Sequence, residues 1–306
     1  MARADPAVAL VSVVGPVEGY LLDAFLDHYL SLGVSEVLLA LHLGPELGQD
    51  KEKELLAQTR DRAEVVEIDR GPWRAEMNPS LFKELRSRCR AEWHVIADSD
   101  EFQYYRGTLQ DRAAKLERSS RVAATGLFWD RITPEGELRH PRPGESLDQA
   151  YSRGAFISPI LLDADPRKIT LARRDVELSW GNHHARAVAP ELIAEPPMPV
   201  HHFKWRGDCI DYLRGRITQF AGSPHRVEMS GCDEAQEAVA LFDDQGRLRG
   251  ALPPATCPRP TVLSRLPRGW RDIATPIWRY WQYERWVGVE EWWEAKRRPP
   301  GELEHQ

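Results

Sequence analysis

Cysteine is scarce in this sequence, and the few cysteines are far apart. The 306 residues contain four of them, Cys89, Cys209, Cys232 and Cys257. No two form a Cys-x-x-Cys pair, so the sequence predicts neither a zinc site built on thiolates nor a disulfide framework. We therefore expect a reduced, cytoplasmic setting.

The sequence also lacks long apolar runs and an excess of basic charge. No stretch approaches the ~20 apolar residues that a membrane-spanning helix needs. The apolar run 7–14 is too short for a signal peptide and no small-residue cleavage site follows it, so we expect it to be a strand. The net charge of −6 argues against a basic surface that binds nucleic acid.

Hydrophobic residues make up 42% of the chain, which is enough for a substantial core. Apolar runs that predict strands alternate with helical patterns from residue 7 to residue 100. The expected strands are 7–14, 37–41, 65–68 and 93–97, and the expected helices are 18–32, 51–60 and one that opens at 78–79. This alternation predicts an α/β fold with a mostly parallel, doubly wound sheet.

The apolar run 93–97 ends abruptly in the carboxylates Asp98, Asp100 and Glu101. If the strand continues through Asp100, then Asp98 and Asp100 point to the same side. Ligands bind beyond the carboxyl ends of strands in open α/β sheets. Carboxylate oxygens there suit Mg²⁺ or Mn²⁺ holding a diphosphate. The alternative interpretation is a solvated turn after a strand.

The later part of the chain predicts a second, smaller unit. Residues 130–150 are rich in proline, glycine and charge, which indicates a long and functional loop. A helix is expected at 208–220, and the character of the sequence changes near residue 225. We expect residues 1–225 to form the main domain, and 226–306 a loop-rich and helical appendage packed on it.

The appendage contains a tryptophan-rich stretch between residues 275 and 293. Three interpretations of it remain open. The rings could pack as core against the main domain, or they could stack on an acceptor sugar. They could also make peripheral contact with a membrane, because tryptophan and arginine suit headgroup depth.

The order of these elements resembles glycosyltransferase family 2, whose sugar-nucleotide-dependent enzymes have the GT-A fold. The resemblance covers roughly residues 7 to 222. Its motifs are the first turn with Glu18, the helix that ends in Leu32-Gly33-Val34, the triplet Asp98-Ser99-Asp100-Glu101-Phe102, and His202 before the 208–220 helix. It implies a Rossmann-like, mostly parallel sheet flanked by helices.

The resemblance also implies a metal site. Asp100 would coordinate Mn²⁺ or Mg²⁺, and Asp98 would contact the metal or the ribose. A late histidine would supply a further ligand, which the resemblance assigns to His202. His201 and His202 would point to opposite faces of a strand, so at most one of them faces the metal. A hydrogen-bonded histidine at a strand end is the alternative for either residue.

Three further residues would contact the nucleotide. Glu18 is retained from the family's first turn, while Pro16 and Val17 depart from the usual Lys-Asn pair. Lys204 and Arg206 would clamp phosphate, since guanidinium favours bidentate contacts with oxyanions. The end of the second strand lacks the family's acidic, serine-rich turn, so it does not indicate the donor base.

An inverting transferase needs a carboxylate that deprotonates the acceptor hydroxyl. The candidates are Asp130, Glu145, Asp148 and Asp175. Asp148 resembles an acidic position of the family and is preferred over Asp130, which directly follows a strand. Each of these residues is otherwise a surface carboxylate.

The expected function is therefore metal-dependent, inverting transfer of a sugar from a nucleoside-diphosphate sugar to a hydroxyl of a glycan or small-molecule acceptor. One alternative is a catalytically silent relative that binds sugar or a protein partner. A second is a metal-dependent hydrolase that uses His183 or His184. The sugar, the acceptor and the donor base stay open.

Overall fold

The computed structural model describes residues 6–44, 47–74, 76–105, 107–162 and 164–250. The tryptophan-rich stretch and Cys257 lie outside these described residues. None of the described helices is long and apolar enough to cross a membrane.

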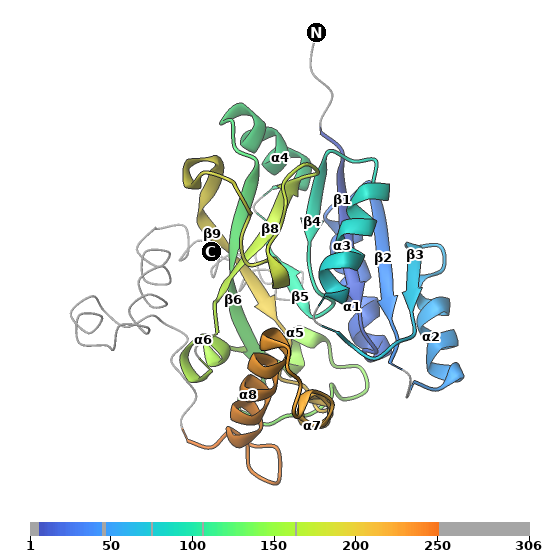
Figure 1. Cartoon of the computed structure of the whole chain (residues 1–306), viewed down its shortest axis with the longest axis vertical. Helices are drawn as coiled ribbons and strands as arrows, with labels where there is room; N and C mark the ends of the chain where they lie inside the picture. Colours follow the sequence, from blue (N-terminus) through green and yellow to red (C-terminus); the bar gives the residue numbers. More distant parts are fainter. Residues whose placement is uncertain (1–5, 45–46, 75, 106, 163, 251–306) are drawn as a thin grey trace, which may run out of the picture.

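Strands of the described residues form a single sheet, in the order β3-β2-β1-β4-β8-β6-β9-β5, with β7 paired to β6 (Figure 1). Their bounds are β1 (Val8–Val14), β2 (Glu36–His42), β3 (Glu64–Asp69), β4 (Trp93–Ile96), β5 (Glu101–Gln103), β6 (Ala123–Ile132), β7 (Arg153–Ala155), β8 (Arg167–Arg173) and β9 (Ile193–His202).

The helices cover both faces of the sheet and the edge where the parallel strands end (Figure 1). Their bounds are α1 (Gly19–Ser31), α2 (Gln49–Thr59), α3 (Met77–Arg88), α4 (Leu109–Arg118), α5 (Leu147–Ala150), α6 (Ile157–Leu161), α7 (Cys209–Phe220) and α8 (Arg226–Ala240), with short 3-10 turns at Trp180–Asn182 and Pro190–Leu192.

The sheet is mixed. Strand β1 pairs in parallel with β2 and β4, and β2 pairs in parallel with β3. Strand β8 then runs antiparallel to both β4 and β6, and β5 runs antiparallel to β9. The prediction of a mostly parallel sheet is therefore right as far as β4, and beyond β4 only the pairing of β6 with β9 among the described strands is parallel. The regular strand–helix alternation that produces parallel crossovers ends at β4, and later strands can return antiparallel.

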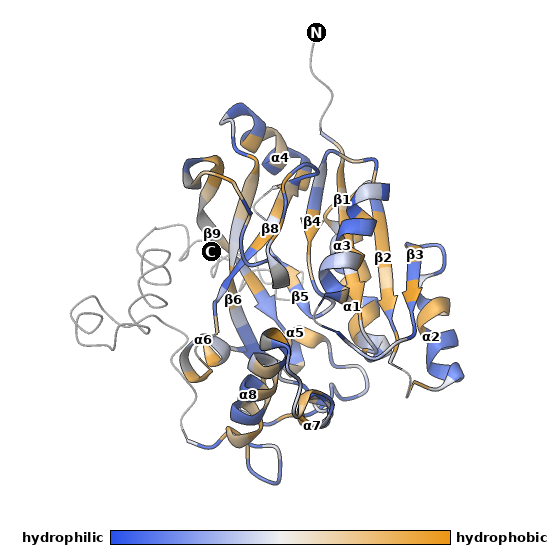
Figure 2. Ribbon diagram, viewed as in Figure 1, coloured by the Kyte–Doolittle hydropathy of each residue, from blue (hydrophilic) through white to orange (hydrophobic). Residues whose placement is uncertain are grey.

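Residues of β1 alternate between two hydrophobic cores. Leu10 belongs to the core that contains Phe25 of α1. Val11, its neighbour in sequence, belongs to the core that contains Leu85 of α3. Figure 2 shows the resulting apolar centre in β1, β2 and β4, with a more polar α2 at the periphery. The two cores fix β1 and β4 in place. Glu18 follows β1 in the sequence, and the acidic triplet follows β4.

A third core joins α7 and α8 to the sheet. It contains Trp205, Leu213 of α7, Ala235 of α8 and Ile132 of β6, all buried. The predicted boundary at residue 225 falls between the two helices that share this core. The part of the predicted appendage that the structure describes is thus packed on the sheet.

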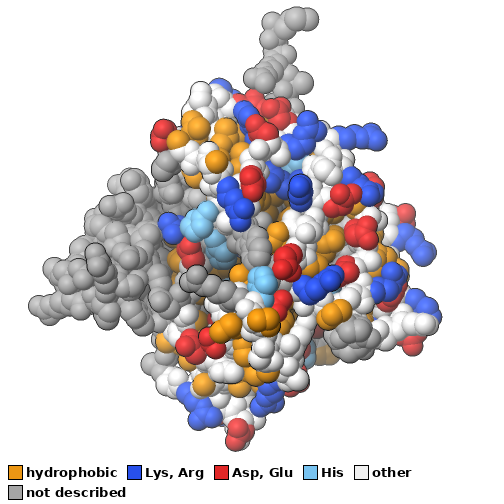
Figure 3. All heavy atoms as spheres, viewed as in Figure 1, with side chains coloured by type: hydrophobic (Ala, Val, Ile, Leu, Met, Phe, Trp, Pro, Cys, Tyr) orange, Lys and Arg blue, Asp and Glu red, His pale blue; other side chains and the backbone are white. Residues whose placement is uncertain are grey.

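Charged side chains of both signs are interspersed on the face drawn in Figure 3. That face shows no broad basic surface of the kind that binds a nucleic-acid backbone.

A buried arginine ties α3 to the end of β8. The guanidinium of Arg86 donates to the carbonyl oxygens of Val176 (2.6 Å) and Arg173 (2.7 Å). Its Nε donates to Nδ1 of His94 in β4, at 3.2 Å. Burial lowers the pKa of His94 to about 4, so the ring is a neutral acceptor. One side chain thus satisfies acceptors on two strand segments.

We expect Arg86→Met to lower the free energy of unfolding by about 3 kcal/mol, because buried carbonyl oxygens lose charged donors. Urea denaturation followed by circular dichroism measures this loss. Arg88→Met, on the same helix but exposed and paired with Glu84 at 2.7 Å, is the matched control and should change stability by less than about 0.5 kcal/mol. Equal effects of the two substitutions would contradict the role given to Arg86.

Candidate active site

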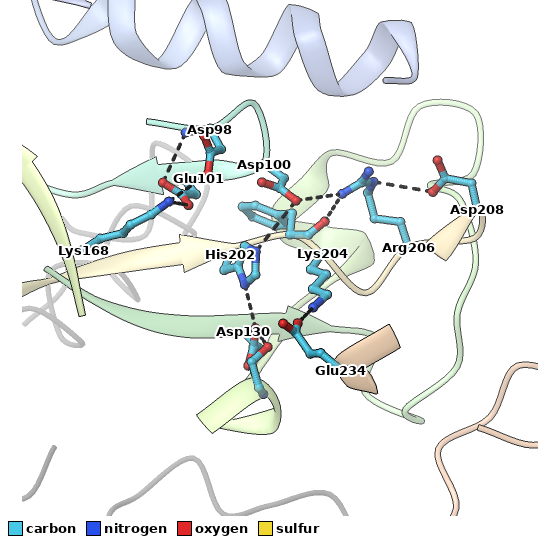
Figure 4. A network of polar contacts seen from close by, with 12 residues as sticks. Asp98, Asp100, Glu101, Asp130, Lys168, His202, Lys204, Arg206, Asp208 and Glu234 are labelled. Atoms are coloured by element: carbon cyan, nitrogen blue, oxygen red, sulfur yellow. Dashed lines mark hydrogen bonds and ion pairs between the residues drawn. The ribbon is translucent and has the colours of Figure 1, made fainter. Parts of the chain in front are cut away.

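The acidic triplet lies at the carboxyl end of β4, beside the carboxyl end of its parallel neighbour β1. Strand β4 ends at Ile96, so Asp98 and Asp100 lie in a turn rather than on the strand. The turn is closed by Glu101, whose backbone N–H donates to the carbonyl oxygen of Asp98 at 3.0 Å. The strand therefore does not continue through Asp100, which was the condition for Asp98 and Asp100 to point to the same side, and the two aspartates contact different partners (Figure 4).

Asp98 faces a buried lysine. Nζ of Lys168 lies 2.8 Å from Oδ2 of Asp98 and 2.8 Å from Oε1 of Glu101. Burial raises the pKa of Glu101 to about 8, helped by the charges of Asp98 and Asp100 and opposed by Lys168. Burial also tends to raise the pKa of Asp98, but the adjacent ammonium outweighs it and the pKa is lowered. Asp98 is thus an ionised carboxylate with a fixed counter-ion.

Asp100 faces a histidine and an arginine. Its Oδ2 lies 3.8 Å from Nε2 of His202 and 3.7 Å from Nη1 of Arg206. Both separations exceed hydrogen-bonding distance. Two of the predicted metal ligands, Asp100 and His202, are therefore close together, whereas Asp98 is directed to Lys168.

The ring of His202 is fixed on its other side by Asp130 of β6. Nδ1 of His202 lies 2.9 Å from Oδ1 of Asp130, and the ring stacks on Phe128 at a centroid distance of 4.5 Å. Burial of His202 lowers its pKa, but the hydrogen bond to Asp130 and the nearby carboxylates outweigh this and raise it. These contacts aim Nε2 at Asp100.

Asp130 itself is fully buried. The backbone N–H of Ser158 donates to Oδ2 at 2.7 Å, and the Ser158 hydroxyl donates to Oδ1 at 3.0 Å. With both oxygens engaged and none exposed, Asp130 is better suited to orient His202 than to accept a proton from a substrate.

The predicted nucleotide contacts Glu18 and Arg206 are neighbours. Nε of Arg206 lies 3.4 Å from Oε1 of Glu18 and 3.8 Å from Oδ1 of Asp208. The guanidinium is buried and donates to the carbonyl oxygen of Phe203. Arg206 thus joins the segment after β1, the triplet and the start of α7.

Lys204 points away from Asp100, toward α8 (Figure 4). Its Nζ donates to Oε1 of Glu234 at 3.0 Å. Of the two basic residues predicted to clamp phosphate, the structure places Arg206 beside the triplet and pairs Lys204 with a carboxylate.

The remaining predicted carboxylates lie elsewhere. Asp148 lines a pocket of about 510 Å³ between α1 and the segment before β7, together with Tyr20, Tyr104 and Phe203. Asp98, Asp100, Asp130 and His202 do not line this pocket. Glu145 is held by Arg139 at 2.7 and 2.9 Å, and Asp175 by Arg173 at 2.9 Å.

His183 and His184 contact neither Asp100 nor His202. Nδ1 of His183 lies 2.6 Å from the carbonyl oxygen of Arg167, and Nε2 of His184 lies 3.2 Å from Asp165. Burial and the charge of Lys168 lower the pKa of His183, and Asp98 opposes this, so His183 lies on the Asp98 side of the triplet.

The network of Figure 4, with Glu18 added, carries more acidic than basic groups. Its carboxyl groups belong to Glu18, Asp98, Asp100, Glu101, Asp130, Asp208 and Glu234, and its permanent cations to Lys168, Lys204 and Arg206. Among the described residues, no three His, Cys, Asp or Glu side chains form a complete metal site. The acidic excess fits a cation that two protein ligands hold and that phosphate oxygens complete.

The sequence motifs do not indicate Lys168, Asp208 or Glu234 as residues of the site. Lys168 is the second residue of β8, whose sequence RKITLAR contains three basic residues, so the local sequence does not mark this lysine as buried. Asp208 and Glu234 begin or lie on helices with ordinary amphipathic patterns, and nothing in the local sequence marks them.

No protein-family model matches the sequence, and no curated protein sequence matches it. Solved structures are similar to it. The S. aureus TarS structure has 11% identity over 77% of this chain and 43% of TarS, with a TM-score of 0.32. The TarS fragment 1–349 with UDP-GlcNAc has 11% identity over 77% of this chain and 72% of the fragment, with a TM-score of 0.35. The chain thus spans less than half the length of that TarS chain.

The mannosyltransferase PcManGT from Pyrobaculum calidifontis, in complex with GDP-Man and Mn²⁺, is also similar. It has 13% identity over 92% of this chain and 88% of PcManGT, with a TM-score of 0.39. These similarities extend over most of this chain. Their TM-scores lie below 0.5, so only the side chains of this chain bear on its function.

We expect Lys168→Met to lower the free energy of unfolding by about 3–5 kcal/mol at pH 8, because the buried Glu101 and its neighbour Asp98 lose their shared cation. Without Lys168 the raised pKa of Glu101 rises further, and the pKa of Asp98, which Lys168 lowers in the wild-type protein, rises as well. The destabilisation is therefore greatest above the raised pKa values and shrinks as the pH falls through them toward pH 4.

Urea denaturation at pH 8 and pH 5 measures this difference. Lys115→Met, at an exposed position of α4, is the control and should change stability by less than about 0.5 kcal/mol. Adding Glu101→Gln to Lys168→Met should recover part of the loss at pH 8. A loss that is the same at both pH values would contradict the ion-pair interpretation.

Proposed function

We propose that the protein is a metal-dependent glycosyltransferase of the GT-A type. It transfers a sugar from a nucleoside-diphosphate sugar to a hydroxyl of a glycan or small-molecule acceptor. The observation that carries this proposal is the arrangement of Asp100 between His202 and Arg206 at the carboxyl ends of β1 and β4. An aspartate, a histidine and a guanidinium thus lie together where an α/β sheet binds its ligand, which supports a site for a cation and a diphosphate.

The residues present fit Mn²⁺ or Mg²⁺. Oδ2 of Asp100 and Nε2 of His202 face each other at 3.8 Å, and Asp130 fixes the histidine from behind. A histidine ligand held by a carboxylate is a common support for a metal ion. When bound, the cation would offset the negative charge that develops on the departing diphosphate.

Arg206 and Lys168 have separate roles beside Asp100 and His202. Arg206 is a fixed positive charge beside Asp100 and can contact a diphosphate oxygen. Lys168 holds Asp98 in the turn, which leaves the outer part of that carboxylate for a ribose hydroxyl or the metal. Direct attack of one acceptor hydroxyl on the anomeric carbon, without a protein nucleophile, inverts the configuration.

One observation favours a catalytically silent relative as the second candidate. The first aspartate of the triplet is already paired with Lys168, at 2.8 Å. A protein that uses this ion pair only to hold the fold would bind sugar or a partner without needing a metal. The two candidates differ in whether a divalent cation strengthens nucleotide binding.

Isothermal titration calorimetry with GDP and UDP separates the two candidates. We expect Mn²⁺ to strengthen binding of one of these nucleotides, and Asp100→Asn to weaken this Mn²⁺-dependent binding by about 100-fold, because a charged ligand is lost. Asp50→Asn removes an equally small acidic group from the exposed surface of α2 and should leave it unchanged. Absence of Mn²⁺-dependent binding by the wild-type protein would exclude the metal-dependent transferase.

A further prediction concerns the residue behind the histidine. Asp130→Asn should lower the affinity for Mn²⁺ by about 10- to 100-fold, since the asparagine supports the ring of His202 less well. Nucleotide binding without metal should not change. Titration of Mn²⁺ by electron paramagnetic resonance measures the free ion directly, and an unchanged affinity would remove Asp130 from the metal site.

A further inference from the structure

Two acidic side chains share one nitrogen of Arg206. Oε1 of Glu18 lies 3.4 Å from Nε, and Oδ1 of Asp208 lies 3.8 Å from the same atom. Oε2 of Glu18 and Oδ1 of Asp208 are both shielded from solvent, and neither has a hydrogen-bond partner among the described residues. A proton on one carboxyl group would supply the missing donor, so the two groups are arranged to share one.

The side chain of Asp208 does not cap the helix that follows it. It is the N-cap residue of α7, but its side chain makes no capping hydrogen bond. The side chain is 37% exposed although Oδ1 is shielded. One part of the carboxylate therefore faces Arg206 and Glu18, and the other part is open to a ligand.

Arg206 also separates Asp208 from the metal-binding pair. Its Nη1 lies 3.7 Å from Asp100, while its Nε faces Asp208. A carboxylate in this position is near the triplet without being a ligand of the same ion. A proton acceptor needs this arrangement, because a metal-bound carboxylate is a poor base.

We propose that Asp208 is the general base of the reaction. This inference rests on the proposed glycosyl transfer. Asp208 takes the proton of the acceptor hydroxyl as its oxygen forms a bond to the anomeric carbon. The bond between that carbon and the phosphate oxygen breaks, and its electron pair leaves with the nucleoside diphosphate. The products are the glycoside, the diphosphate and a protonated Asp208, which loses its proton to water.

The charges around Asp208 agree with this role. Burial and Glu18 raise the pKa of Asp208 to about 6, against the opposing effect of Arg206. Burial also acts to raise the pKa of Glu18, but Arg206 and the interaction with Asp208 outweigh it and lower that pKa. The hydroxyl of Tyr20 (3.2 Å) and Nδ1 of His140 (3.5 Å) also face Glu18. Opposed shifts in a carboxyl pair give one member a basicity suited to neutral pH.

The carboxylates considered from the sequence are less suited to this role. Asp130 is fully buried with both oxygens bonded, and Glu145 and Asp175 are held by arginines. Asp148 lines a pocket that Asp100 and His202 do not line. Asp148 is the competing base in the experiment.

The test measures release of nucleoside diphosphate from UDP-GlcNAc and from GDP-Man with Mn²⁺, with water in place of the acceptor hydroxyl. Asp208→Asn should lower kcat by about 100-fold or more and leave the Kd for the donor unchanged. Asp211→Asn, on the exposed face of α7, is the matched control and should leave kcat unchanged. Circular dichroism confirms folding of each variant.

The pH profile separates a base from a structural residue. In the wild-type protein, kcat should fall as the pH drops below about 6, because Asp208 becomes protonated. Glu18→Gln removes a negative charge that raises the pKa of Asp208, so the acidic limb should move to lower pH. A purely structural role of Asp208 would leave this limb in place.

The outcomes are distinct. Donor binding with full turnover by Asp208→Asn overturns this inference and leaves the proposed function standing. Loss of turnover in Asp148→Asn but not in Asp208→Asn assigns the base to Asp148 instead. Failure of the wild-type protein to bind either donor overturns the proposed function, and this inference with it.

Discussion

The pairing of β9 between β6 and β5 determines how the site is built. Its register sets His202 opposite Asp130 on one side and opposite Glu101 on the other. Residues paired across neighbouring strands point to the same face, so an acid, a histidine and a second acid form a row across three strands. A shift of β9 by one residue would put His201 in this row. That side chain now packs against Tyr104 and Trp129.

The row explains why the two aspartates of the triplet differ. Glu101 is the first residue of β5 and is held in the row, so the turn before it has a fixed path. Along that path Asp98 meets Lys168 and Asp100 meets His202 and Arg206. Asp98 forms a close ion pair with Lys168 at 2.8 Å, whereas Asp100 lies 3.8 Å from His202 and 3.7 Å from Arg206. The difference comes from the backbone and not from the spacing of the two residues.

The sequence predicts the first half of the fold better than the second. Alternating apolar runs and helical patterns locate the strands from β1 to β4, because each strand is buried and each helix has an apolar face. The antiparallel returns of β8 and β5 depend on pairings between distant segments, which no local pattern carries. The same limit applies to side chains. The motifs indicate Asp100 and His202, but Lys168 and Asp208 join them only through contacts made in the folded chain.

Lys204 and Glu234 have a further consequence for the extent of the folded unit. The ion pair joins the end of β9 to α8, next to His202, and the Lys204 side chain is largely shielded from water. A chain that stopped at residue 225 would keep the ammonium and lose its carboxylate. The unbalanced charge would then act on the histidine and on any cation bound beside it. Charge pairing beside the site, as well as hydrophobic packing, therefore joins the residues on the two sides of position 225.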